Sequence, residues 1–308
     1  MSTRGLGGLF AALLTLCPQT QASAQATATD RWRTINPPSL RITGRTTAKA
    51  LGEASGAVAS LANPGVYWTI GDSGNPPELL ATDSAGMLRA RITIVGATNV
   101  DWESVGLGAC GAARCIYIAD TGDNRERRAS VTIYRIPEPI LPGPSGGLRI
   151  PAERLTMRYP DHPHDVEATG VLPGGDLLLV TKGRSGAVVA FIVPARSWGL
   201  NRTVRATLLD TLPILPHAGT GRLVTGLAVD PTSPRIAIRT YRDIYLFDRD
   251  EATGRLTPHQ WIQCNILGTE PQGEGIAWDG PGWDFLLISE RGFFTSGSVA
   301  RVSCTPRQ

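Results

Sequence analysis

The sequence predicts an all-β fold, a five-bladed β-propeller built of four-stranded antiparallel blades. Three observations support this prediction. Glycine and proline are frequent, at 35 and 23 of 308 residues, as in proteins made of short strands and turns. Helical periodicity is almost absent after residue 48. A unit of strands recurs five times at spacings of roughly 48 to 64 residues, the size of a propeller blade.

Each unit has the same order of segments. A polar, mostly acidic start leads into small apolar residues, and a turn then separates these from a second apolar run and a third strand. The starts begin at Glu53, Asp101, Asp165, Leu223 and Gln272, the second runs at Val66, Cys115, Asp176, Arg235 and Asp284, and the third strands span 78–82, 131–136, 187–193, 243–247 and 298–304.

The fifth unit has no room for a fourth strand before Gln308, whereas an unassigned strand at 39–44 precedes the first unit. We therefore expect the ring to be closed by this N-terminal strand, which leaves no exposed sheet edge. The expected domains are a signal peptide at 1–24, an extension at 25–38 and a single propeller at 39–308.

Residues 1–24 have the pattern of a secretory signal. Arg4 supplies the positive charge, 5–16 form a short apolar stretch, and Ala22-Ser23-Ala24 is a small-residue cleavage site. Cys17 is removed with this segment. We predict a secreted or periplasmic protein.

Four cysteines then remain. Cys110 and Cys115 bracket a four-residue turn, and Cys264 and Cys304 pair by elimination. A metal site is the alternative, but no second CxxC and no histidine at ligand spacing accompany them. We expect two disulfides.

Charge and hydropathy exclude two classes of partner. The net charge is only +3, from 30 basic and 27 acidic residues, which is too little to predict binding of a nucleic acid polymer. No run of 18 apolar residues predicts a membrane span. We expect a monomer.

The five starts, aligned, place side chains on a common face. In a propeller the first strand of each blade lines the central channel, and residues two apart share a face. One ring of the channel then consists of Ser55, Glu103, Glu167, Thr225 and Glu274, and a second of Glu53, Asp101, Asp165, Leu223 and Gln272.

Six of these ten side chains are acidic, and a hard cation with oxygen ligands would compensate their repulsion. The sequence therefore predicts Ca²⁺ at the first ring. Carboxylates solvated in a wide channel, and a carboxylate pair acting on a glycoside, are the alternatives.

The second strands return to the same mouth of the channel, where they end at Asp72, Asp120, Lys182, Thr240 and Glu290. We predict that Asp72, Asp101 or Asp120 acts as a base. The basic side chains expected to bind a small polar or anionic ligand are Lys182, Arg184, Arg242 and Arg291.

The five starts, with their hydroxyl and glutamate positions in register, resemble the secreted calcium-activated nucleotidases (apyrases), which are five-bladed propellers with an axial calcium. The fifth start carries Glu274-Gly275-Ile276, similar to a Glu-Gly-Ile of that family. The resemblance covers two or three residues of each start. It implies hydrolysis of nucleoside di- and triphosphates, with calcium and acidic residues at the mouth activating water. The residues that bind the nucleotide in that family have no match in this sequence.

A second resemblance covers roughly residues 50–140. The segments 68–75, 99–103, 118–124 and 132–139 are similar to a group of uncharacterised bacterial secreted propellers, which implies the fold and no activity.

Two motifs predict no chemistry of their own. Gly71-Asp72-Ser73-Gly74 is like a serine-protease loop, but every histidine lies downstream of it. His162-Pro163-His164 enters the third start, where a solvated loop is the simpler interpretation than an imidazole near the ion.

We therefore expect a calcium-dependent hydrolase of phosphate-containing, nucleotide-like substrates. The alternative is a non-enzymatic module in which calcium holds the blades together and the mouth binds a peptide, glycan or protein. A lactonase-type propeller enzyme is a third possibility. It is disfavoured, because enzymes of that type have six blades and the sequence predicts five.

Overall fold

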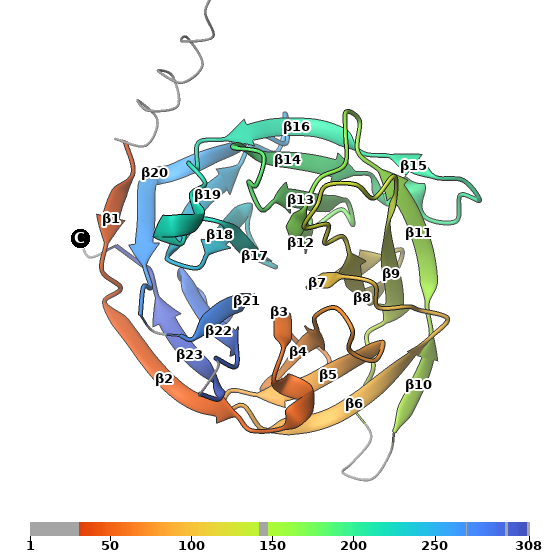
Figure 1. The fold of residues 1–308 in the computed structure, drawn as a ribbon, viewed down its shortest axis with the longest axis horizontal. Coiled ribbons are helices and arrows are strands. Elements are labelled where there is room, and N and C mark those ends of the chain that lie inside the picture. Colours follow the sequence, from red (N-terminus) through yellow and green to blue (C-terminus); the bar gives the residue numbers. More distant parts are fainter. Residues whose placement is uncertain (1–30, 142–146, 269, 293–294, 307–308) are drawn as a thin grey trace, which may run out of the picture.

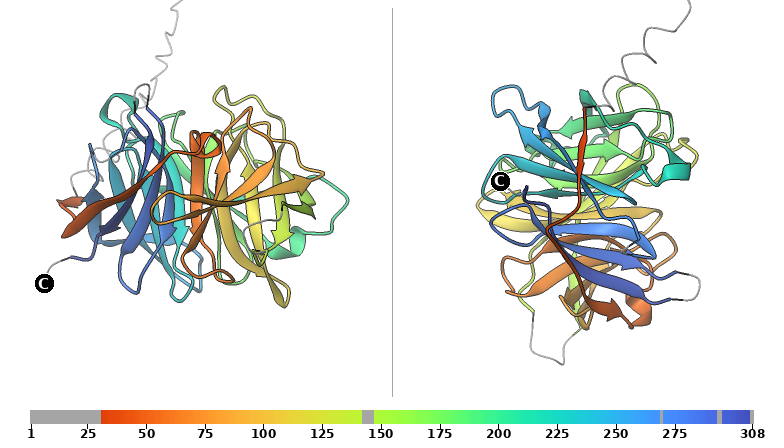
Figure 2. Two further views of the ribbon diagram at one scale, coloured as in Figure 1. Left: turned by 90° about the horizontal axis from the view of Figure 1, so that it is seen from below. Right: turned by 90° about the vertical axis from the view of Figure 1, so that its left-hand side faces the viewer.

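Five twisted sheets stand around a common axis in the computed structural model, which describes residues 31–141, 147–268, 270–292 and 295–306 (Figure 1). The side views show the blades standing side by side around the ring (Figure 2). The predicted all-β, five-bladed propeller is confirmed. The predicted signal peptide at 1–24 lies outside the described residues.

Each blade runs outward from the axis through four antiparallel strands. The first holds β3 (Ala54–Ala59), β4 (Val66–Gly71), β5 (Glu78–Asp83) and β6 (Leu88–Val95), and the second β7 (Trp102–Cys110), β8 (Ala113–Asp120), β9 (Val131–Pro137) and β11 (Glu153–Arg158). The third holds β12 (Val166–Val171), β13 (Leu177–Thr181), β14 (Val188–Val193) and β16 (Thr207–Leu212), the fourth β17 (Val224–Val229), β18 (Arg235–Thr240), β19 (Asp243–Arg249) and β20 (Leu256–Asn265), and the fifth β21 (Gln272–Trp278), β22 (Asp284–Glu290), β23 (Gly297–Ser303) and β2 (Ser39–Thr46).

The ring closes as the sequence predicts. Strand β2 pairs antiparallel with β23, from Ser39 opposite Ser303 to Thr46 opposite Gly297, and so becomes the outer strand of the fifth blade (Figure 1). Residues from opposite ends of the chain thereby share one sheet, and no blade is left incomplete.

Three blades carry a fifth strand, which corrects the prediction of four strands throughout. The short strands β1 (Arg33–Ile35), β10 (Leu148–Pro151) and β15 (Val204–Arg205) pair parallel with β20, β6 and β11. Each directly precedes the outer strand of one blade but pairs with the outer strand of the blade before it. We call these three short strands straps. They are two to four residues long, which is too short for a periodic pattern to reveal them in the sequence.

The first strap also places part of the predicted extension against the propeller. Trp32 is buried, and its ring packs edge-on against Tyr245, Phe247 and Trp261 of the fourth blade. Aromatic contacts of this kind bury a large apolar area, so the segment before β2 contributes to the packing of the ring.

Helix is nearly absent from the described part of the chain. It consists there of three 3-10 turns, η1 (Lys49–Leu51), η2 (Ala195–Ser197) and η3 (Ala218–Thr220). No described helix is long and apolar enough to cross a membrane.

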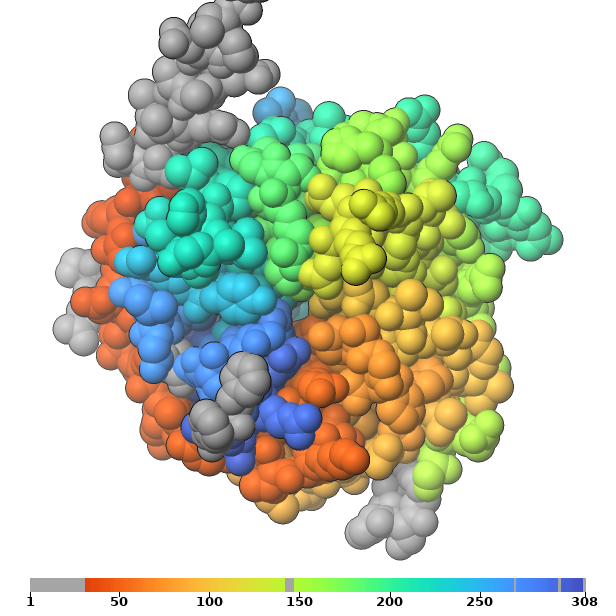
Figure 3. Space-filling view, viewed as in Figure 1, coloured from red at the N-terminus to blue at the C-terminus, as the bar shows by residue number. Residues whose placement is uncertain are grey.

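The first strands begin at the face that is turned toward the viewer in Figures 1 and 3, where η1 and η3 also lie. We call this face the mouth. The ends of the second strands, including Asp72, Asp120 and Lys182, return to it, so the predicted polar residues do gather on one side of the disc.

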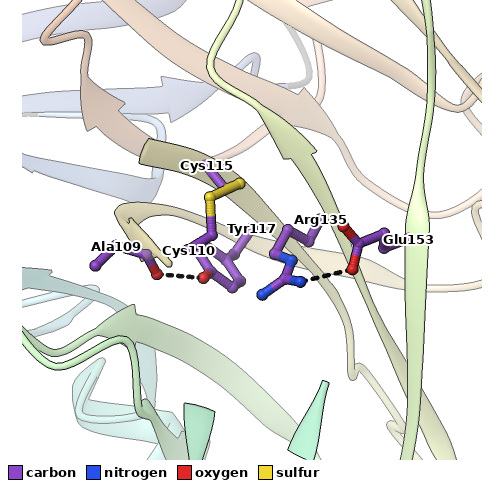
Figure 4. The surroundings of a disulfide bond; sticks show 6 residues. All are labelled: Ala109, Cys110, Cys115, Tyr117, Arg135 and Glu153. Carbon is purple, nitrogen blue, oxygen red and sulfur yellow. Dashed lines mark hydrogen bonds and ion pairs between the residues drawn. A yellow bond between two sulfur atoms is a disulfide. The ribbon is translucent and has the colours of Figure 1, made fainter. Parts of the chain in front are cut away.

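Both predicted disulfides are present. Cys110–Cys115 closes the turn between β7 and β8, next to a Tyr117 hydroxyl that donates to the Ala109 carbonyl at 2.6 Å (Figure 4). Cys264–Cys304 joins β20 of the fourth blade to the end of the fifth. The second bond therefore reinforces the closure of the ring, whereas the first is local.

Loss of the closing disulfide should destabilise the protein more than loss of the local one. The chain-entropy model assigns about 4 kcal/mol to the loop of 40 residues and about 2 kcal/mol to the loop of five. We expect C264S/C304S to lower the free energy of unfolding in urea by about twice as much as C110S/C115S. Equal losses would show that the Cys264–Cys304 bond does not constrain the unfolded chain as the loop lengths require.

Candidate functional site

A β-bulge interrupts all five first strands, and it occurs at the same point in four of them. The register shifts across Glu103, Glu167, Thr225 and Glu274, each of which is the extra residue between two paired neighbours. In the first blade the shift follows directly after Ser55, at Gly56, whose φ is +66°. Glu103, Glu167, Thr225 and Glu274 are thus structurally equivalent, and the bulge re-aims each of these side chains relative to a regular strand. Ser55 differs, because it pairs with Ile70 directly before the bulge of its strand.

The first strands approach one another closely around the axis. The Ser55 hydroxyl donates to the Glu103 carbonyl oxygen of the next blade at 2.8 Å. A Cβ on Gly226 would lie 2.6 Å from the Glu274 carbonyl oxygen, so only glycine fits there. All five ring residues are between 1% and 6% exposed, which does not match carboxylates solvated in a wide channel.

One ring glutamate has a cation of the protein itself as its partner. Lys182, at the end of the second strand of the third blade, places its Nζ 2.6 Å from Glu167 Oε1, and both side chains are buried. Burial works against the charge of Lys182, but Glu167, Tyr241 and Glu274 outweigh it and raise the lysine pKa. Part of the positive charge that the sequence predicts for an ion is therefore supplied by Lys182, which lies beside Glu167.

Glu274 is held by neutral donors. One oxygen accepts hydrogen bonds from the Tyr241 hydroxyl at 3.1 Å and the Gln272 amide at 3.3 Å, while the other is buried without a partner among the described residues. Burial raises the pKa of Glu274 to about 7, opposed by the charge of Lys182. Thr225 likewise has a buried hydroxyl without a partner in the described part of the chain.

Three carboxylates gather at the mouth between the first and second blades. Asp72, Asp101 and Glu103 each have one carboxylate oxygen that lies within 4.8 Å of the other two. The three ring glutamates, Glu103, Glu167 and Glu274, do not come this close to one another. Glu103 is 6% exposed, and its carboxylate has no hydrogen-bond donor among the described residues. We call these three residues the carboxylate trio.

The loop after β8 closes tightly over the trio. A Cβ on Gly122 would lie 2.4 Å from Glu103 Oε1 and 2.6 Å from Asp101 Oδ2, so the glycine permits the approach of the loop backbone. Burial, then Asp72 and Asp165, raises the pKa of Asp101 to about 6. Burial, then Glu167 and Asp72, raises that of Glu103 well above its usual range.

Asp120, predicted as a possible base, is a positioning residue in this structure. Asp120 is buried, and its carboxylate accepts a hydrogen bond from the Asp101 backbone N–H at 3.1 Å. The same carboxylate forms an ion pair with Arg128 at 2.9 Å. These contacts hold the start of β7, where Asp101 and Glu103 lie.

The predicted ligand-binding cations all face carboxylates. Arg184 pairs with Asp165, and Arg291 Nη2 lies 3.4 Å from Glu53. Arg242 and Arg222 lie 3.6 and 3.9 Å from Asp243. Because Lys182 is also engaged, none of the four predicted residues offers a cation without an acidic neighbour.

Glu290 is a mouth residue that the predicted site did not include. It ends β22, and its carboxylate has no hydrogen-bond donor among the described residues. Burial, then Asp72 and Glu53, raises its pKa to about 7. Its place at the end of a second strand, equivalent to Asp72 and Asp120, was the available sequence signal.

The opposite end of the channel is largely apolar. A cavity of about 590 Å³ is lined there by the ends of the first strands of all five blades, including Val105, Val171, Leu227 and Ile276, although Asp230 and Asp279 also line it. None of the ring or trio carboxylates lines this cavity. It could not be predicted from the sequence, because the pattern along one strand does not show how five strand ends combine.

No protein family and no curated protein sequence matches the chain. Among solved structures, it is similar to the PQQ-bound aldose sugar dehydrogenase of Streptomyces coelicolor, with 10% identity, a TM-score of 0.47, and coverage of 87% of this chain and 100% of that one. It is also similar to the glutaminyl cyclase of Myxococcus xanthus, with 12% identity, a TM-score of 0.45, and coverage of 88% and 97%.

An auxiliary nutrient binding protein of Bacteroides thetaiotaomicron gives 12% identity and a TM-score of 0.45, over 84% of this chain and 63% of that one. Similarity this distant says nothing about the site or the activity.

The metal-free protein should become less stable as the pH rises from about 5 to 8. The pKa of Glu274 and Glu290 is about 7 in the folded chain against 4.5 as the ordinary value. The folded state therefore binds more protons than the unfolded state in this range, and the free energy of unfolding falls as they are released.

Urea unfolding at a series of pH values would measure this slope, and Glu290→Gln should flatten it. Glu251→Gln, which removes an exposed charge elsewhere, is the matched control and should leave it unchanged. Stability that rises over this range would contradict the raised pKa values.

Proposed function

We propose that this chain is a secreted or periplasmic calcium-binding propeller that hydrolyses small phosphate-containing substrates at the mouth. The observation that carries the proposal is Glu103, a buried carboxylate without a hydrogen-bond donor among the described residues, beside Asp72 and Asp101. A buried charge in this position requires a partner, and a cation is the partner that three carboxylates favour.

The residues fit calcium better than a softer metal. The trio offers only carboxylate oxygens, with neither sulfur nor imidazole, and irregular oxygen-rich sites are typical of calcium. Lys182 already neutralises Glu167, so we place the ion at the trio, with Glu103 shared between it and the predicted axial ring. Ser55, Glu167, Thr225 and Glu274 then form the wall behind the site.

Each mouth residue has a distinct part in this proposal. Calcium, when bound, supplies positive charge that attracts and polarises a phosphate oxygen. Asp120 and Arg128 hold the strand that carries the trio. Glu290 accepts a proton from water, because it is the mouth carboxylate outside the trio that no described residue engages.

The location outside the cytoplasm rests on the two disulfides, which persist in oxidising compartments. A nucleotide-like substrate, as the apyrase resemblance implies, fits the proposed ion but draws no support from the predicted mouth cations, which are paired.

A non-enzymatic binding module is the second candidate. The observation in its favour is the same pairing of Lys182, Arg184, Arg242 and Arg291 with acidic neighbours, because cations held this way are less available to stabilise charge in a transition state. In that case the ion would fix the blades and a polar ligand would bind over it.

Calcium should raise the thermal midpoint of the metal-stripped protein, and magnesium should raise it less. At calcium a hundredfold above the dissociation constant, linkage predicts about 2.7 kcal/mol of added stability. Asp101→Asn and Glu103→Gln should abolish the shift.

Glu167→Gln and Glu274→Gln distinguish the trio from the axial ring. Both should retain most of the shift if the trio holds the ion, and both should lose it if the ion lies on the axis. Glu153→Gln, on an outer strand, is the control for loss of charge. The absence of any calcium-dependent shift in the wild type would overturn the metal site.

The hydrolase should release phosphate from nucleoside di- or triphosphates only when calcium is present. We expect Glu290→Gln to reduce the rate at least a hundredfold while calcium still shifts the midpoint, because the variant loses the proton acceptor and keeps the trio. Calcium binding without release of phosphate would favour the binding module, and release in a metal chelator would refute the mechanism.

A further inference from the structure

A concave basic pocket lies on the mouth face beside the carboxylate trio. It has a volume of about 400 Å³, within the range of small-molecule sites, and lies between the loop after β8, the end of β11 and strap β15. Its lining includes four arginines, Arg127, Arg128, Arg158 and Arg205, against a single carboxylate, that of Asp161. We call it the arginine pocket.

Three of these arginines have no carboxylate partner among the described residues. Arg128 pairs with Asp120, but Arg127, Arg158 and Arg205 form no ion pair there, and the one hydrogen bond of these three side chains runs from Arg205 to the Pro160 carbonyl. This distinguishes the arginine pocket from the channel mouth, where the predicted cations face acidic neighbours.

The one carboxylate of the pocket is already engaged. The carboxylate of Asp161 contacts two imidazoles. One oxygen lies 3.0 Å from His164 Nε2, and the other lies 3.2 Å from His162 Nδ1. His164 is buried and packs against Tyr159 and Phe191. Asp161 is thereby held within its own loop and forms no ion pair with the arginines of the pocket, which outnumber it.

The loop that carries two of the arginines is tightly built. Asp123 accepts hydrogen bonds from the backbone N–H groups of Arg127 and Arg128 at 2.5 and 2.6 Å. Glu126, directly before the two arginines, has a φ of +50°, a left-handed conformation that is unfavourable for a residue with a side chain. The backbone of Arg127 and Arg128 is thus fixed at the edge of the pocket by its hydrogen bonds to Asp123.

Tyr159 provides an unused donor at the same place. It lines the pocket, is 7% exposed, and its hydroxyl is buried without a hydrogen-bond partner among the described residues. A buried hydroxyl without a partner costs stability. Because this hydroxyl is closed off from the pocket, the guanidinium groups rather than Tyr159 carry the proposed site.

We propose that the arginine pocket binds a phosphate group, as a phosphomonoester or the end of a polyphosphate. Guanidinium groups match the geometry of phosphate oxygens and bind them in pairs, which favours phosphate over a carboxylate ligand. The pocket is larger than one phosphate, and the remaining space accommodates part of the molecule that carries it. The site needs no metal, so it stands whether or not the trio binds calcium.

Titration calorimetry of the metal-stripped protein with pyrophosphate at low ionic strength tests the proposal. We expect saturable binding with one site per chain, weakened at least tenfold in R158Q/R205Q, because charge-assisted hydrogen bonds of this strength are lost. Arg127→Gln gives an independent measurement if the double variant does not fold.

R41Q/R149Q is the matched control, because both arginines are exposed, lie outside the pocket and form no ion pair among the described residues. It removes the same charge and should bind pyrophosphate like the wild type. No saturable binding by the wild type, an unchanged affinity in R158Q/R205Q, or an equal loss in the control would each overturn the arginine pocket. Metal-free conditions keep these outcomes separate from any failure of the calcium site.

Discussion

The close approach of the five first strands around the axis is the constraint on which the rest of the structure depends. It admits only glycine where one strand faces its neighbour's backbone, as at Gly226 opposite Glu274. Each of these strands also has a bulge, at the same point in four of the five, and the side chains there are buried. Acidic side chains forced together in this way cannot all be charged without compensation.

The structure compensates these charges in different ways around one mouth. Lys182 neutralises Glu167, Arg128 neutralises Asp120, and Arg184 neutralises Asp165, all within the protein. The carboxylate trio has no such partner at Glu103, and this asymmetry is why the proposed ion sits toward one side of the channel. The arginine pocket is the converse case, in which cations outnumber acids, and the chain of Arg128, Asp120 and Asp101 joins the two regions.

Closure of the ring relies on several contacts. Strand β2 completes the fifth blade by pairing with β23, whereas the disulfide Cys264–Cys304 and strap β1 with Trp32 connect the fourth and fifth blades. Straps β10 and β15 repeat the arrangement between other blades. Each strap precedes an outer strand, so the chain pairs with one blade immediately before it enters the next.

The number of blades, the closing strand, both disulfides and the equivalence of four of the five ring positions could be predicted from the sequence, because repeats, alternation and cysteine spacing act locally along the chain. Which charges meet depends on the tertiary fold. Lys182 lies 15 residues from Glu167, and Asp72 lies 31 residues before Glu103, so neither contact leaves a local pattern. The straps, the apolar cavity and the arginine pocket also depend on how separate blades pack, which no single segment encodes.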